Sequence, residues 1–275
     1  MNKIFLAFCL LFAFTANAQL KTPPPSTAQS VKQEFGLSSI ELSYARPNMK
    51  ERKIYGGLVP YDKVWRTGAN AATTLTFGDE VMIGGKKIPA GKYGLLTIPG
   101  KASWTIIITK QTNVTSPAAY KQEEDVVRVN AKVNTTASRA ETFTIQFANV
   151  QAESCELQII WDNVMVALPI RTDVDAKVMA AIDEAMKGDK PPYFQAAAYY
   201  LENNKDITKA NEWFAKAAEA NPKAFWIKYQ QAKGLAKAGK KAEARAAAQA
   251  SKELAIAAKS DDYVKLNDAL LAELK

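Results

Sequence analysis

The stretch that decides the fold of the first part of the chain runs from residue 155 to residue 170. It reads Cys155-Glu156-Leu157-Gln158-Ile159-Ile160-Trp161-Asp162-Asn163-Val164-Met165-Val166-Ala167-Leu168-Pro169-Ile170. Every second residue from Cys155 to Trp161 is apolar, and so is every second residue from Val164 to Ile170. A period of two places alternate side chains on opposite faces of a β-strand, and a strand with one polar face is typical of antiparallel sheets. The stretch therefore predicts antiparallel strands.

The same period recurs through the preceding residues. It is found in residues 40–44, 74–77, 127–133 and 143–147. Gly84-Gly85 stands between two short apolar segments, which is typical of a tight hairpin, and prolines and glycines bound two more expected strands, near 92–98 and 103–109. About nine or ten short strands at this spacing predict an antiparallel β-sandwich of Greek-key type over residues 31–172, with an open barrel as the alternative.

After Thr172 the apolar period becomes helical and alanine becomes abundant. Ala198 and Ala232 are 34 residues apart, as are Ala210 and Ala244. This period and its small residues resemble tetratricopeptide repeats, in which small side chains let paired helices pack closely. We predict an all-α, tetratricopeptide-like helical-repeat domain of about six helices over residues 173–275. The fold class expected for the chain is thus α+β in two domains.

The N-terminus resembles a secretory signal. Met1-Asn2-Lys3 gives a positive start, residues 4–16 are almost wholly apolar, and Ala16-Asn17-Ala18 matches the small-x-small cleavage pattern. Thirteen residues span roughly 20 Å as a helix, short of the ~30 Å core of a bilayer, so no stable membrane anchor is expected. A retained anchor and a lipid-modified Cys9 are the alternatives. We predict a signal peptide over 1–18 cleaved after Ala18, a Pro-rich leader over 19–30, and a periplasmic or extracellular location.

The composition limits the chemistry. The chain has no histidine, which excludes Ser-His-Asp and Cys-His nucleophiles and histidine-bearing zinc sites. Calcium, phosphate-loop and nucleophile-elbow motifs are also missing from the sequence. We therefore assign no catalytic residue, no metal site and no cofactor. Cys155 shares a strand face with apolar residues, so it is expected to be a buried apolar side chain.

The segment from Arg46 to Thr74 has neither a strand period nor a helix period. Six Lys or Arg stand against two acidic residues between Arg46 and Arg66, in a chain of net charge +8. A connection of this length is typical of a functional loop, and its aromatic residues argue against disorder. Arginines interleaved with aromatics can bind an anion and stack on a ring. The candidate ligand-binding residues are Arg46, Arg52, Tyr55, Tyr61, Trp65, Arg66, Asn70 and Thr74.

Two interpretations of this segment remain open. In the first it binds an anionic or polyhydroxy ligand, and nucleic acid is not expected because the chain is predicted to be exported. In the second it closes one end of the β domain, with Trp65 filling the core and Arg66 capping carbonyl groups.

The β half also resembles a known family. The resemblance rests on residues 44–47, 57–70, 73–74, 88–95 and 97–99, which include Gly57-Leu58-Val59-Pro60-Tyr61-Asp62-Lys63-Val64-Trp65-Arg66-Thr67-Gly68-Ala69-Asn70. Residues of about 26–171 are similar to the exported bacterial family catalogued as domain of unknown function 2911. The resemblance implies a Bacteroidota-like source, a signal peptide and, in some members, a helical-repeat tail. It implies no activity. Ala45 stands where such sequences often have serine.

The helical half offers a second surface. Similarity to tetratricopeptide repeats places Tyr199, Trp226, Tyr229 and Lys233 in an inner groove that could hold a protein partner. The alternative is that the aromatic residues pack inside the helical domain and the lysine is solvated.

Three functions compete on these grounds. The preferred one is a non-catalytic binding module for an anionic or polyhydroxy ligand of the cell envelope, with a helical tail that docks a partner. The second is a histidine-free hydrolase or lyase acting on envelope glycans through carboxylates such as Asp62. The third is an envelope assembly scaffold without a small ligand.

Overall fold

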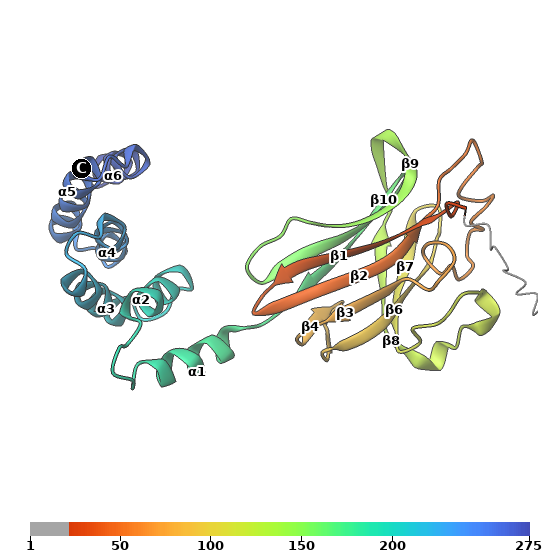
Figure 1. Ribbon diagram of the computed structural model, residues 1–275, viewed down its shortest axis with the longest axis horizontal. Helices are drawn as coiled ribbons and strands as arrows, with labels where there is room; N and C mark the ends of the chain where they lie inside the picture. Colours follow the sequence, from red (N-terminus) through yellow and green to blue (C-terminus); the bar gives the residue numbers. More distant parts are fainter. Residues whose placement is uncertain (1–21) are drawn as a thin grey trace, which may run out of the picture. The chain divides into compact units, whose positions relative to one another are not determined.

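The computed structural model describes residues 22–275, which divide into two compact units (Figure 1). The first unit ends at Asp173 and the second spans Val174–Lys275. The predicted signal peptide over 1–18 and the first residues of the leader lie outside the described residues. Within the described part of the chain, every helix is too short or too polar to cross a bilayer.

Two antiparallel sheets form the first unit, and six strands make the larger one. In spatial order these are β1 (Thr27–Phe35), β2 (Ser38–Arg46), β3 (Thr74–Phe77), β6 (Gly91–Ile98), β7 (Ser103–Thr109) and β8 (Asp125–Lys132). The second sheet has the order β5 (Lys86–Ile88), β4 (Val81–Ile83), β10 (Ser154–Arg171) and β9 (Asn134–Ala148). Neighbours in the larger sheet follow chain order except at β3 and β6, between which the chain visits the second sheet.

The hairpin that the sequence predicted joins β4 to β5. Ile83 pairs with Lys86, so Gly84 and Gly85 form a two-residue loop, and both have positive φ (59° and 77°). A two-residue hairpin whose central residues both have positive φ favours glycine, asparagine or aspartate, because most other residues are strained in that conformation. A Cβ on Gly84 would also meet Val129 at 2.6 Å.

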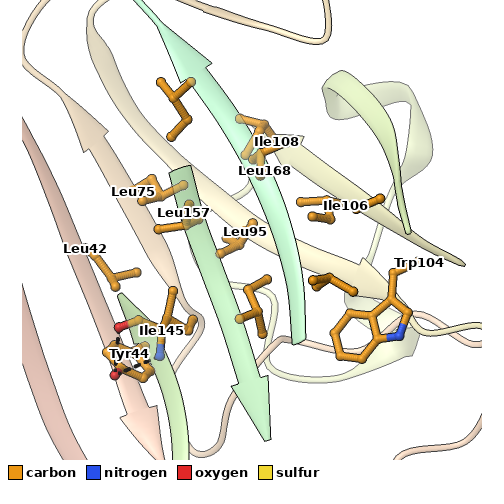
Figure 2. Close-up of a cluster of buried hydrophobic side chains, with 14 of the residues drawn as sticks. Leu42, Tyr44, Leu75, Leu95, Trp104, Ile106, Ile108, Ile145, Leu157 and Leu168 are labelled. Carbon is orange, nitrogen blue, oxygen red and sulfur yellow. Dashed lines mark hydrogen bonds between the residues drawn. The ribbon is translucent and has the colours of Figure 1, made fainter. Parts of the chain in front are cut away.

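One buried cluster is shared by both sheets. Figure 2 shows Leu42, Leu75 and Leu95 of the six-stranded sheet beside Leu157 and Leu168 of β10, all of them at most 1 % exposed. The alternating residues that predicted the strands are those that fill this core. Two facing apolar surfaces therefore hold the first unit together.

The stretch from 155 to 170 forms one long bent strand, β10. The pairing of β10 with β9 shifts between Ile160 and Asp162 and again between Asp162 and Val164. Asp162 has φ +54°, and its carboxylate accepts a hydrogen bond from Arg139 Nε at 2.6 Å. A bulge lets a strand change which residues face the core. It explains why the apolar positions are odd-numbered up to Trp161 and even-numbered from Val164.

The two sheets are joined where the chain leaves β2 and meets β9. The chain after β2 pairs with β9: Met49 N donates to Glu141 O at 2.8 Å and Phe143 N donates to Pro47 O at 2.9 Å. The Tyr44 hydroxyl accepts from Ile145 N at 3.0 Å and lies 3.1 Å from Ile145 O (Figure 2). The loop that leaves β2 is therefore fixed to the opposite sheet from its first residues.

The expected leader is shorter than predicted, because β1 begins at Thr27 rather than after residue 30. Its backbone pairs with β2 from Thr27 opposite Arg46 to Phe35 opposite Ser38. The first residues of β1 are mostly exposed, so they show no alternation of apolar and polar residues from which a strand could be predicted. Their strand conformation depends on backbone pairing with β2.

Six helices make up the second unit. They are α1 (Asp175–Ala185), α2 (Tyr193–Glu202), α3 (Ile207–Ala220), α4 (Phe225–Lys237), α5 (Lys241–Ala257) and α6 (Asp261–Glu273). Asp206 caps α3, since its carboxylate accepts from Thr208 N and Lys209 N. The sequence predicted about six helices, and the structure has six.

Alanine determines how closely these helices pack. Ala210 of α3 and Ala244 of α5 are fully buried, as is Ala232 of α4. The helices α3 and α5 begin 34 residues apart, which is the period seen in the sequence. Small side chains at repeated positions allow the helix backbones to approach closely.

Cys155 should be chemically inert while the chain is folded. It is 2 % exposed, and burial raises the pKa of its thiol to about 11, so almost none of it is thiolate at neutral pH. In a chain that begins at Gln19, and so lacks Cys9, we expect no labelling by a disulfide reagent at pH 7–8 without denaturant and one thiol per chain in urea. Rapid labelling without denaturant would show that β10 is packed differently.

Candidate functional site

Trp65 anchors the loop of residues 46–74 to both sheets. Its backbone forms a two-bond bridge with Thr97 of β6, with N···O distances of 2.7 and 3.0 Å. Its indole ring stacks on Trp161 of β10 at 6.0 Å and meets the edges of Trp104 and Phe143 at 6.2 and 5.1 Å. Aromatic rings contribute large buried areas and specific edge contacts. The loop therefore packs against the core through Trp65, which is itself half-buried.

The residue two positions later holds a strained conformation. Thr67 is fully buried and has φ +56°, which is unfavourable for a β-branched residue. Its hydroxyl lies 3.0 Å from that of Thr97, and its carbonyl accepts from Thr73 Oγ1 at 2.7 Å. This hydroxyl network holds the backbone in the conformation that follows Arg66.

Positive φ values are concentrated in this loop. Among the described residues nine that are not glycine have positive φ, and five of them lie in it: Lys50, Glu51, Asp62, Thr67 and Asn70. Such conformations cost about 1–3 kcal/mol each and persist only where the surroundings determine them, which is typical of binding and catalytic sites.

A second loop, residues 110–124, packs beside the first. Val114 is buried with Leu96 and Ile107 on the outer face of the larger sheet, and Val64 of the first loop packs against them. The Tyr120 hydroxyl donates to Asp125 Oδ2, and Arg128 Nε donates to the same oxygen at 2.8 Å. Burial, and then the bond to Asp125, raise the pKa of Tyr120. The outer face of the sheet thus brings the two loops together.

A cavity of about 580 Å³ lies between these loops. We call it the Trp65 pocket. Its apolar lining comes mainly from Leu58, Val59, Pro60, Val64, Trp65 and Trp161, and further prolines line it at 25, 47 and 117. Its volume is in the range of cavities that hold small ligands.

Three cations line the Trp65 pocket, namely Lys50, Arg52 and Arg66. Arg52 donates to the Met49 and Asn48 carbonyls at 2.9 and 2.6 Å, and Arg66 Nη1 donates to the Thr115 carbonyl. Arg66 Nε is buried without a hydrogen-bond partner among the described residues. None of the described residues that line the pocket is acidic. The lining itself therefore carries three positive charges and no negative one, while the Glu141 carboxylate, outside the lining, accepts from Lys50 N at 2.9 Å.

Over the described part of the chain, no group of three or more Cys, Asp or Glu side chains could hold a metal ion. Tyr55 and Asp162 are close enough for the carboxylate to affect the phenol, but burial comes first among the causes that raise the pKa of Tyr55.

The comparison with protein families identifies the β unit. The family model described as protein of unknown function (DUF2911) matches residues 26–170, which is more than half of the chain. The chain belongs to this family. Comparison with curated proteins and with solved structures finds no match. The family match ends before the helical unit and includes both loops of the Trp65 pocket.

Of the eight ligand-binding residues predicted in the DUF2911 domain, Arg52, Trp65 and Arg66 line the Trp65 pocket. The structure also gives both arginines the carbonyl-capping role that the second interpretation of the loop assigned to Arg66, and gives Trp65 its place in the core.

The other five predicted residues lie outside this pocket. Arg46 donates to the Phe143 carbonyl and lines a separate cavity of about 230 Å³ beside β1 and β9. Tyr55 is 7 % exposed and packs on Trp104. Thr74 is buried in β3.

The remaining two also have structural contacts. Asn70 Nδ2 donates to the Ser26 carbonyl at 3.2 Å. The ring of Tyr61 packs against the core, with Lys101 Nζ 6.0 Å from its centre. In a segment without periodicity, sequence alone does not distinguish an aromatic residue that packs from one that faces a ligand.

Several lining residues were not predicted. Lys50 contributed to the charge of the loop, and that charge was the signal that could have identified it. Thr115 and Pro117 come from the other loop, and only the outer face of the sheet brings them near. The signal that could have identified Trp161 lies in β10, where the apolar positions change from odd-numbered to even-numbered directly after it.

The helical unit has a groove of about 550 Å³ of its own. Tyr229 and Lys233 line it, together with Leu266 and Leu270. Two predicted partner-binding residues do not: the Tyr199 hydroxyl donates to Asp175 Oδ1 at 2.8 Å, and Trp226 is 43 % exposed elsewhere on α4. The same Asp175 carboxylate also accepts from Lys205 Nζ at 2.7 Å.

Replacing Thr67 by valine should destabilise the DUF2911 domain. Thr67→Val keeps the shape but removes the hydroxyl and leaves the buried Thr97 hydroxyl without that partner, at a cost of about 1–3 kcal/mol. Urea unfolding followed by tryptophan fluorescence should show a lower midpoint. Thr112→Val, at an exposed threonine, should leave the midpoint unchanged, and equal effects of the two substitutions would contradict the role of the network.

Proposed function

We propose that this chain is an exported binding protein of the cell envelope that takes an anionic or polyhydroxy ligand in the Trp65 pocket. The observation that carries the proposal is three cations in a largely apolar cavity whose described lining has no acidic residue. The strain gathered in the loop supports a site, because strained backbone is retained where a defined geometry is needed. The predicted signal peptide supplies the location.

A binding role accounts for this pocket better than glycan hydrolysis. Most glycosidases need two carboxyl groups on either side of the scissile bond. The described lining of the Trp65 pocket offers none, and Asp62, the carboxylate named for the hydrolase alternative, lies outside it.

We further propose that the scaffold is a Greek-key sandwich followed by tetratricopeptide-like repeats. The chain path supports the Greek-key sandwich, because β4 and β5 belong to the second sheet although they lie between β3 and β6 in sequence. The 34-residue spacing of α3 and α5 supports the tetratricopeptide-like repeats. The groove at Tyr229 and Lys233 is then the surface proposed to dock a protein partner.

Removing one pocket cation should weaken binding of an acidic sugar. The Lys50 ammonium has no partner among the described residues, so Lys50→Gln should remove a charge without disturbing the fold. N-acetylmuramic acid and N-acetylglucosamine differ by a carboxylate-bearing group, and titration calorimetry should show tighter binding of the acid to the full chain. Lys50→Gln should weaken that binding by about 10-fold or more, since a charge-assisted hydrogen bond contributes about 1.5–3 kcal/mol.

Lys53→Gln is the matched control, because Lys53 is exposed in the same loop and does not line the pocket. It should leave the affinity unchanged. Equal losses from Lys50→Gln and Lys53→Gln would mean that the charge of the loop, and not the pocket, attracts the acid.

The helical groove should be needed for any protein partner. We expect Lys233→Glu to abolish crosslinked species formed by the full chain in the native envelope, because it reverses a charge inside the groove. Lys223→Glu reverses an exposed charge outside the groove and should retain those species. If both variants retain them, the partner does not bind in this groove.

A further inference from the structure

The Trp65 pocket is rich in free hydrogen-bond donors. Lys50 presents an ammonium group with no partner among the described residues. Arg52 and Arg66 each use some of their five N–H groups on backbone carbonyls and keep the others. The indole of Trp65 can only donate.

Several acceptors in the same lining already take part in hydrogen bonds. The carbonyls of Pro47, Asn48, Val59, Trp65 and Thr115 each accept a hydrogen bond from within the protein. Asn48 Oδ1 accepts from Thr142 Oγ1 at 2.7 Å. As no described lining residue is acidic, side-chain carboxylates add no acceptor.

This imbalance distinguishes classes of ligand. Each hydroxyl of a neutral sugar both donates and accepts, whereas the Lys and Arg side chains of this lining only donate, so a neutral polyhydroxy ligand would pair fewer of its own donors here. A carboxylate, phosphate or sulfonate group only accepts, which matches what the lining offers.

The apolar part of the lining requires something more than a small anion. Leu58 is 46 % exposed at the pocket, and Val64, Pro60 and the ring of Trp65 line it as well. An inorganic anion would leave these surfaces in water, whereas an apolar body attached to the anion would cover them.

Resting on the proposed function, we propose that the ligand is an amphipathic anion, one acidic group carried on an apolar ring or acyl chain, rather than a neutral glycan. The acidic group binds at Lys50, Arg52 and Arg66, and the apolar body lies against Leu58, Val64 and Trp65.

The test uses two dyes that differ by an acidic group, anilinonaphthalene sulfonate and phenylnaphthylamine. Fluorescence titration of the full folded chain should give an affinity about 10-fold or more higher for the sulfonate, and Lys50→Gln should remove most of that difference while Lys50→Arg restores it. Lys53→Gln should change neither affinity, and each variant's urea midpoint shows that it is folded. Displacement of the dye by decanoate would show that the apolar part of the ligand is an acyl chain. Displacement by naphthoate but not by decanoate would show that it is an aromatic ring. Both outcomes support the proposal.

Three results would overturn it. Equal affinity for the two dyes would show a pocket that does not select an anion. Binding of N-acetylmuramic acid without binding of the sulfonate dye would overturn the amphipathic class and leave the proposed function standing. Absence of binding by every probe, acidic sugar and dyes alike, would overturn both.

Discussion

The packing of Trp65 is the interaction on which the rest of the β unit depends. Its ring contacts Trp161 and Phe143 of one sheet and Trp104 of the other, and its backbone is paired with β6. Moving the loop would expose a large apolar area and break that pairing at the same time. The walls of the pocket are thus fixed by the same contacts that hold the two sheets together, and little ordering remains to be done when a ligand binds.

The strain in the loop follows from this anchoring. A chain pinned at Met49 to β9 and at Trp65 to β6 must turn sharply between and after these points. The left-handed conformations at Lys50, Asp62 and Thr67 are the result. Each is unfavourable alone. The buried hydroxyl network at Thr67 and the core contacts of Trp65 offset that cost, and for this reason a loop without regular structure is nonetheless well defined.

The sequence predicted the parts of the molecule in which apolar residues recur with a regular period. Alternating residues such as Leu157 and Ile159 predicted the strands, and the helical apolar period after Thr172 predicted the helices, because burial imposes those periods. The pocket was predicted only in part. Charge and aromatic content singled out the loop, but nothing local separates Tyr55, which is buried, from Trp65, which reaches both core and pocket. Thr115 could not be predicted, since its place depends on packing across the outer face of the sheet.

The two interpretations of the loop therefore need not exclude one another. Arg52 and Arg66 cap backbone carbonyls, as a purely structural loop requires, and two of the capped carbonyls, those of Asn48 and Thr115, belong to residues that line the pocket. The guanidinium groups keep unused donors and their charge. An arginine that stabilises the loop in this way also biases the cavity towards ligands that only accept hydrogen bonds. The selectivity that we infer for the pocket is thus a consequence of how the loop is held, and it needs no residue dedicated to binding except Lys50.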